Sequence, residues 1–163
     1  MKMNLLGQFL ADVEWGKLDH LVVDLPPGTG DEPLSVCQLI PDITGGIVVT
    51  TPQEVALSDV RKCVNFCSDI ELPVLGVVEN MSGYVCPNCG ERSDIFGAGG
   101  GEDMADRMKV PFLGHIPMDP RMVEACDAGN ICVEEFPDSE ASSALKAVVD
   151  RITESSERDN QSN

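Results

Sequence analysis

Short runs of β-branched residues that alternate with longer amphipathic stretches constrain this chain more than any other feature. The runs at residues 21–25, 46–51, 73–78 and 110–117 each begin or end at proline or glycine, which is typical of buried strands. Apolar residues at helical spacing predict helices over residues 4–14, 31–40, 53–69, 101–108, 120–128 and 139–154. Strands that alternate with helices indicate βαβ units, so we predict an α/β fold whose mostly parallel sheet is flanked by helices on both faces.

Length and charge narrow the class of protein. The chain of 163 residues fits one domain, which we place at residues 1–154, followed by a disordered polar tail at 155–163. Lys and Arg number 11 against 28 Asp and Glu, and the resulting net charge of −17 disfavours binding to nucleic acid or to anionic membranes. No apolar run approaches the roughly 20 residues of a membrane span, and the first residues lack the pattern of a signal peptide. We therefore expect a cytoplasmic protein, and the 4% of aromatic residues predict an aliphatic core.

Polar and turn residues follow all four predicted strands. They stand at residues 24–28, 50–53, 79–80 and 117–119. Parallel strands end at the same edge of a sheet, and ligands of open α/β sheets bind there. Asp24, at the end of the predicted strand 21–25, is suited to hold Mg²⁺ through water, and the backbone N–H groups of Gly28, Thr29 and Gly30 could face a terminal phosphate. The alternative is that Asp24 only caps the loop that follows it.

Cys86 and Cys89 form a C-x-x-C group, followed by Gly90, in a predicted loop over residues 80–98. Two thiolates at this spacing can bind one edge of a metal site, but a zinc or [4Fe–4S] site needs four ligands. Other cysteines of the chain could supply the rest, or two chains could each donate a pair across a two-fold axis. An inert surface pair or an adventitious disulfide is the other interpretation.

The glycine-rich segment at residues 97–101 is a weak candidate for binding phosphate. No Lys-Ser or Lys-Thr follows it, so it is not a Walker A loop. Glu102 and Asp103 fall in the first turn of the next predicted helix, where they would repel a phosphate. We expect a flexible hinge beside the cysteine loop, and we expect structural roles for His20 and His115.

These motifs together resemble a known family. The matching blocks are residues 21–32 (LVVDLPPGTGDE), 49–53 (VTTPQ), 78–82 (VENMS), 86–90 (CPNCG), 96–100 (FGAGG) and 114–120 (GHIPMDP). In this order they resemble the Mrp/Nbp35 (ApbC-like) family of iron–sulfur cluster carrier ATPases, over about residues 1–150. The resemblance implies a partial SIMIBI-class P-loop NTPase fold, related to MinD and to the nitrogenase iron protein.

The resemblance also implies roles for individual residues. Asp24 would be the Walker B carboxylate, and Gly28 would lie in the switch that senses the γ-phosphate of ATP, which the complete protein would bind with Mg²⁺. Asn80 would bind the adenine, and Pro117 to Asp119 would complete the base pocket. Cys86 and Cys89 would bridge a [4Fe–4S] cluster across a homodimer, and apo iron–sulfur proteins would be the acceptors.

The sequence departs from the family at the phosphate site. The family's deviant Walker A loop, KGGVGK(S/T), and the switch aspartate after it are absent from these 163 residues. The chain therefore resembles the C-terminal part of a carrier ATPase, and we expect an unpaired strand edge or a bare apolar face. Without the Walker A backbone and lysine we expect no useful ATP hydrolysis by this chain alone, although the cluster-binding part is intact.

Two other functions fit parts of the pattern. The first is a non-catalytic interaction module, in which the C-x-x-C loop binds zinc and a partner supplies the P-loop half. The second is a positioning ATPase of the MinD/ParA kind, which is disfavoured because residues 139–154 carry more acidic than basic side chains and form no basic amphipathic helix. Iron with acid-labile sulfide would distinguish the carrier from the zinc module.

Overall fold

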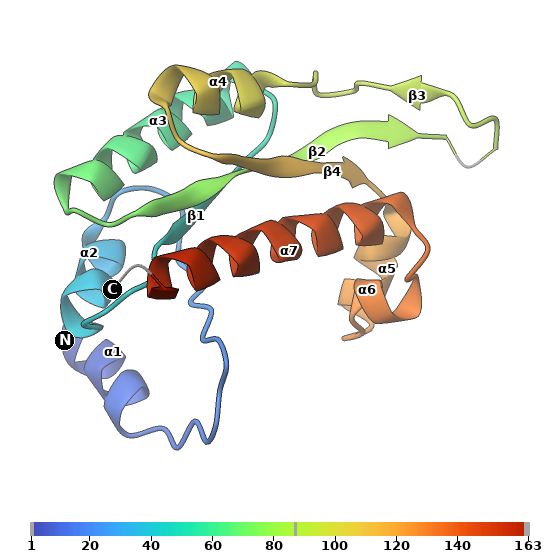
Figure 1. The fold of residues 1–163 in the computed structure, drawn as a ribbon. Helices are drawn as coiled ribbons and strands as arrows, with labels where there is room; N and C mark the ends of the chain where they lie inside the picture. Colours follow the sequence, from blue (N-terminus) through green and yellow to red (C-terminus); the bar gives the residue numbers. More distant parts are fainter. Residues whose placement is uncertain (1, 87, 162–163) are drawn as a thin grey trace.

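The computed structural model of the chain describes the backbone of residues 2–86 and 88–161, with side chains from residue 5 to residue 154 of that part. Figure 1 shows a central sheet with helices on both of its faces. In chain order the elements are α1 (Lys2–Ala11), α2 (Asp31–Leu39), β1 (Gly46–Thr50), α3 (Glu54–Asp69), β2 (Val74–Val85), β3 (Arg92–Ser93), α4 (Gly100–Met108), β4 (Phe112–Met118), α5 (Pro120–Asp127), α6 (Cys132–Glu135) and α7 (Glu140–Gln161).

The strand β2 forms the centre of the sheet. It pairs in parallel with β1 on one side and with β4 on the other, and its far end pairs antiparallel with β3. In this register Thr50 lies opposite Glu79, and Asn80 lies opposite Ile116. The parallel strands β1 and β4 therefore end on the same side of the sheet, β1 beside Glu79 and β4 beside Tyr84, while β2 continues to Val85. The predicted mostly parallel sheet is confirmed.

Two aliphatic clusters fill the layers on either side of the sheet. Val77 and Val78 point to opposite faces of β2 because successive side chains of a strand alternate. Val77 belongs to the cluster with Val48, Leu57, Val64, Met104 and Ala105, under α3 and α4. Val78 belongs to the cluster with Leu113, Ile116 and Val148, under α7. The predicted aliphatic core is confirmed, and α7 crosses the face opposite to α3 and α4 (Figure 1).

The predicted strand at residues 21–25 is wrong. These residues have no regular secondary structure and lie in the open loop between α1 and α2 (Figure 1). Their side chains are exposed, and Val22 is 83% accessible to solvent. Local β propensity is weak unless a neighbouring strand satisfies the backbone groups and a packed face covers the side chains. Within the described residues no strand pairs with this segment, so its β-branched composition does not produce a strand.

One face of β1 carries exposed apolar side chains. Ile47 is 41% and Val49 is 57% accessible, whereas Val48 and Thr50 on the other face are buried. In the described part of the chain β1 pairs only with β2, so its outer edge has no strand partner there. The expected bare apolar face and unpaired edge are thus confirmed. None of the helices in the described residues is both long and apolar enough to cross a membrane.

Two elements are longer than the sequence predicts. The strand β2 continues through Val85, into the predicted loop 80–98, because Tyr84 and Val85 pair with β3 and have high strand propensity. The helix α7 continues through Gln161, into the segment predicted as a disordered tail. Residues 155–161 contain no glycine or proline that would end a helix. Residues 162–163 lie outside the described part.

Candidate functional site

Cys86 and Cys89 lie in the turn that joins β2 to β3, on the hairpin that projects beyond β4 in Figure 1. The Cys86 N–H donates to the Glu91 carbonyl at 3.0 Å, and the Gly90 N–H donates to the Cys86 carbonyl at 2.8 Å. Gly90 has φ 72°, a left-handed conformation that suits glycine and closes the turn. Strand pairing and turn chemistry therefore hold both thiols close together, at the tip of the hairpin.

The turn favours the thiolate form of Cys86. Backbone N–H groups of Cys89 and Asn88, followed by the Cys89 thiol, lower the pKa of Cys86 through hydrogen bonds to its sulfur. Cys89 itself is exposed. Thiolates are the form that binds iron or zinc, so this donor set fits one edge of a metal or cluster site.

The cysteine turn supplies two thiols and no further ligand. Within the described part of the chain, no group of three or more His, Cys, Asp or Glu side chains is arranged to hold a metal ion. The remaining cysteines lie on the helices, at Cys37, Cys63, Cys67, Cys126 and Cys132. None of these cysteines joins Cys86 and Cys89 in a set of three or more metal ligands within the described residues.

The residues that resemble an adenine pocket lie where the last residues of β4 run beside the middle of β2. Asn80 lies opposite Ile116 in the register, which places it beside Pro117. The Asn80 Oδ1 atom accepts the Met81 N–H at 2.8 Å. Asp119 begins α5 by accepting the Arg121 N–H at 3.0 Å. The structure therefore brings Asn80, Pro117 and Asp119 to one edge of the sheet.

Arg121 fixes the charge of Asp119. Its guanidinium donates to both carboxylate oxygens of Asp119, at 3.0 Å from Nε and 2.7 Å from Nη2. The hydrogen bonds from Arg121 lower the pKa of Asp119, although partial burial opposes this. The Asp119 side chain is only 9% accessible. A fixed, ionised acceptor at the start of α5 is therefore available beside the strand ends.

The predicted phosphate-binding residues lie elsewhere. Asp24, Gly28, Thr29 and Gly30 belong to the exposed loop before α2, and Asp24 does not follow a strand as the sequence predicts. Gly30 is the N-cap of α2, whose first turn contains Asp31 and Glu32. These acids oppose an anion at this helix end. The side chains of Asp24 and Thr29 are exposed, so nucleotide-binding roles for this loop stay a prediction.

Sequence analysis missed the function of Glu79, which is completely buried. Its Oε1 atom accepts hydrogen bonds from the Ser82 hydroxyl at 2.6 Å and the Gly99 N–H at 2.9 Å, and its Oε2 atom accepts the Gly101 N–H at 2.5 Å. His115 Nδ1 lies 3.1 Å from Oε1. Burial acts to raise the pKa of Glu79, but the hydrogen bonds it accepts outweigh burial and lower the pKa. A carboxylate within an otherwise apolar strand was the signal that could have revealed this network.

Gly100 and Gly101, at the end of the glycine-rich segment, are packed closely, which corrects the expectation of a flexible hinge for this part of the segment. A Cβ on Gly100 would lie 2.6 Å from the Pro52 carbonyl oxygen. A Cβ on Gly101 would lie 3.0 Å from Thr50 Cγ2 and 3.1 Å from Glu79 Cβ. Glycine is required here because α4 approaches the ends of β1 and β2 directly, and its N–H groups bind a buried carboxylate rather than a phosphate.

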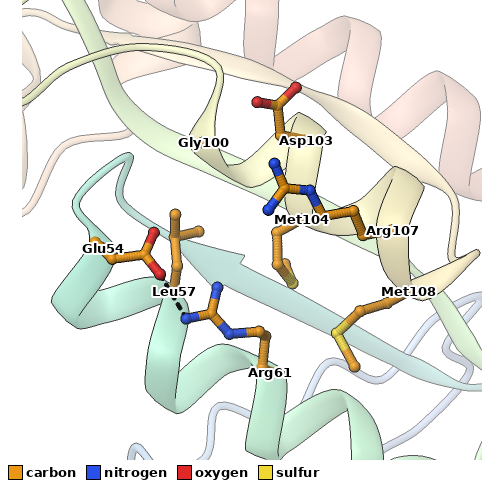
Figure 2. A pocket seen from close by; sticks show the side chains of 8 residues that line it. All are labelled: Glu54, Leu57, Arg61, Gly100, Asp103, Met104, Arg107 and Met108. Atoms are coloured by element: carbon orange, nitrogen blue, oxygen red, sulfur yellow. Dashed lines mark hydrogen bonds and ion pairs between the residues drawn. The ribbon is translucent and has the colours of Figure 1, made fainter.

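A shallow cavity of about 390 Å³ lies between α3 and α4 (Figure 2). Leu57, Met104 and Met108 form its apolar part. Its charged side chains balance one another, because Arg61 and Arg107 face this space together with Glu54 and Asp103. Arg61 donates to Glu54 at 2.6 Å. None of the predicted site residues lines this cavity.

A family model described as "ParA: NUBPL iron-transfer P-loop NTPase" matches residues 1–153. The chain belongs to this family. It is 49% identical over 154 residues to the cytosolic Fe-S cluster assembly factor Nubp2 homolog of Anopheles gambiae, which covers 93% of this chain and 60% of the relative. The chain thus spans about three-fifths of the length of that relative.

Solved structures confirm the α/β P-loop NTPase fold. A nucleotide-binding protein of Archaeoglobus fulgidus in complex with ADP is 39% identical, with a TM-score of 0.71 over 85% of this chain and 56% of that protein. The septum site-determining protein MinD of Pyrococcus horikoshii, in complex with Mg-ADP, is 25% identical, with a TM-score of 0.65 over 90% of this chain and 54% of that protein.

Proposed function

We propose that this chain carries an iron–sulfur cluster as cargo and delivers it to apo iron–sulfur proteins in the cytosol. The observation that carries the proposal is the turn of Cys86 and Cys89, two thiols held together at the tip of a hairpin, with N–H donors that favour the thiolate. The family is one of iron-transfer NTPases, and a relative at 49% identity is named a cytosolic Fe-S cluster assembly factor. A carrier needs cargo ligands that are accessible, and the exposed Cys89 meets this requirement.

The cluster is proposed to lie between two copies of the chain. A [4Fe–4S] cluster takes four thiolates, and each chain supplies Cys86 and Cys89. A two-fold axis through the cluster would bring two identical hairpins together, which is the simplest way to complete the ligand set. The projecting position of the hairpin in Figure 1 supports this, because the helices of one copy do not stand in front of its tip.

Nucleotide is proposed to act at the strand-end edge. Asn80 and the segment from Pro117 to Asp119 would hold the adenine of ATP, and a solved relative was obtained in complex with ADP. Asp24 with Mg²⁺ and the N–H groups of Gly28, Thr29 and Gly30 would face the phosphates once their loop is ordered against this edge. Asn80 lies on β2, six residues before Cys86, which directly follows the end of this strand, so a ligand at Asn80 can influence the cysteine turn through one continuous backbone.

Anaerobic reconstitution with iron and sulfide tests the carrier function. We expect a brown dimer that holds about four irons and four sulfides per two chains, measured by iron and sulfide analysis together with light scattering after size exclusion. Cys86→Ser and Cys89→Ser should each abolish cluster and dimer. Cys126→Ser is the matched control, because Cys126 is an exposed thiol on α5 and should leave both unchanged.

Two results would overturn the proposal. A chain that takes up zinc with sulfur ligation but no iron and sulfide would be a structural zinc module. A cluster that survives in both cysteine variants would show that its ligands lie elsewhere.

A further inference from the structure

One carboxylate oxygen holds both ends of the segment that contains the two cysteines. The Oε1 atom of Glu79 accepts two hydrogen bonds. One comes from the hydroxyl of Ser82, on β2 before the cysteine turn, at 2.6 Å. The other comes from the N–H of Gly99, the N-cap of α4 after the turn, at 2.9 Å. Between these two contacts lie residues 83–98, with the cysteine turn. The loop of the proposed cargo site therefore closes on a single buried group.

The chemistry of this group explains why a carboxylate stands there. Buried charge is unfavourable unless hydrogen bonds replace the lost water. Glu79 has no accessible surface, and it receives N–H or O–H donors on both oxygens, including the Gly101 N–H at 2.5 Å. An amide in its place would direct its own N–H groups at one of these donors, so only a carboxylate accepts from every side. The site is built for an ionised acidic side chain.

We propose that Glu79 is the positioning residue of the cysteine loop, holding both ends of residues 83–98 against the strand-end edge at Asn80. The inference rests on the proposed function and adds to it a group that fixes where the cargo ligands stand. Glu79 lies opposite Thr50 at the end of β1 and directly precedes Asn80. Its hydrogen bonds therefore connect the strand segment beside Asn80, the start of α4 and the base of the β2–β3 hairpin.

Further contacts define how far this unit extends. His115 on β4 places Nδ1 3.1 Å from Glu79 and Nε2 3.2 Å from Glu102 of α4. Arg92 on β3 donates to the Ser82 carbonyl and to Glu140, both at 3.2 Å. The Arg92 side chain is about half exposed, so its bonds are the weaker ones. Of Glu79, His115 and Arg92, Glu79 is the residue that is fully buried and that also binds both Ser82 and Gly99, at the two ends of residues 83–98.

Amide hydrogen exchange on the 163-residue apo chain tests the inference without any cluster. In Glu79→Gln we expect residues 83–98 to exchange about ten- to a hundredfold faster, as for the loss of one hydrogen bond to a charged group. Amides of β1 and α7 should keep their wild-type rates. Ser82→Ala removes only the outgoing contact and should give the same local pattern with a smaller change. Ser35→Ala, another nearly buried hydroxyl, on α2, is the matched control.

The pattern of exchange decides the outcome. Rates that rise evenly in all elements, or do not change at residues 83–98, would show a merely structural role and overturn the inference. If Glu79→Gln does not fold, the Ser82→Ala measurement decides by the same criterion.

A second readout follows the cargo. In reconstituted protein the rate of cluster loss to an iron chelator should rise about tenfold in Glu79→Gln, whereas Ser35→Ala should match the wild type. If Glu79→Gln loses its cluster at the same rate as Ser35→Ala and the wild type, the positioning role is contradicted. A wild-type chain that binds no cluster would instead contradict the proposed function, and the exchange experiment would still decide the role of Glu79.

Discussion

The N–H of Gly101 donates to Oε2 of Glu79 at 2.5 Å, and the same contact leaves no space for a side chain on the glycine. A Cβ would lie 3.0 Å from Thr50 Cγ2 and 3.1 Å from Glu79 Cβ. Gly101→Ala should therefore destabilise the fold by about 1–3 kcal/mol, as overpacking of a closed site does, and urea denaturation measures this.

Gly7→Ala is the control: no atom lies within 4 Å of its Cβ position on α1, so the alanine should be neutral or stabilising by up to about 1 kcal/mol. Equal stability of Gly101→Ala and wild type would show that α4 does not sit so closely on the strand ends.

Lowering the pH should remove the contribution of Glu79 to stability. The pKa of Glu79 is lowered in the folded chain relative to the unfolded chain, because accepted hydrogen bonds outweigh burial. A group of this kind stabilises the fold fully above its unfolded pKa, near 4.3 for Glu, and loses this as pH falls through the folded pKa. The groups that face it are Ser82, the amides of Gly99 and Gly101, and His115.

The measurement is the unfolding free energy of wild type and Glu79→Gln from neutral to acidic pH. The difference between them should be constant above about pH 5 and should shrink below the ordinary carboxyl pKa. A difference that grows as the pH falls would mean that the carboxyl is held in its neutral form.

Sequence analysis succeeded where the local pattern and the tertiary structure agree. The strands β1 and β4 and the first half of β2 coincide with short apolar runs that have proline or glycine near their ends, and they form the parallel sheet that alternation with helices predicts. The C-x-x-C spacing identified the two thiols of the hairpin. Asn80 and Pro117 could be placed together because parallel strands end at the same edge.

It failed where the outcome depends on neighbours distant in sequence. Residues 21–25 have strand composition but no pairing strand among the described residues, so Asp24 is exposed in a loop. The glycine-rich segment resembled a hinge because its contacts with Pro52 and Glu79 are made across the fold. Glu79 was grouped with the polar residues at strand ends, because the sequence does not show that Gly99, Gly101 and His115, from two distant segments, converge on it together with Ser82 of its own strand.

Cys63 should react faster than Cys37 and Cys67 at neutral pH. It lies one turn before Cys67 on α3, and the hydrogen bond from the Cys67 thiol lowers the pKa of Cys63 to about 7, while the same contact raises the pKa of Cys67. Burial raises the pKa of Cys37. Mass spectrometry after a short exposure to iodoacetamide should find Cys63 modified before Cys37 and Cys67. In Cys67→Ala the rate at Cys63 should fall at pH 7 and recover near pH 9; an unchanged rate would contradict the thiol pair.

Asp119 has two separable roles. As N-cap of α5 it should contribute about 1 kcal/mol to stability, so Asp119→Ala should lose about this amount in chemical denaturation. Asp119→Asn keeps an oxygen for the Arg121 N–H and should retain most of the stability. If the carboxylate also binds the nucleotide base, Asp119→Asn should weaken ADP binding measured by calorimetry. Arg121→Gln is the control that removes the ion pair but keeps the carboxylate, and an effect of Arg121→Gln as large as that of Asp119→Asn would assign the loss to the pair.

The 163-residue chain should not turn over ATP on its own. Phosphoryl transfer depends on a backbone cradle and a lysine at the β- and γ-phosphates, and no lysine follows a glycine-rich loop in this sequence. Asp24 lies in an exposed loop rather than after a strand, so it has no fixed position beside the strand-end edge. Phosphate release in the presence of Mg²⁺ should stay at the rate of a blank, and Asp24→Asn should change nothing. Release that increases with protein concentration and disappears in Asp24→Asn would show that the loop closes on the nucleotide and forms a working site without the Walker A segment.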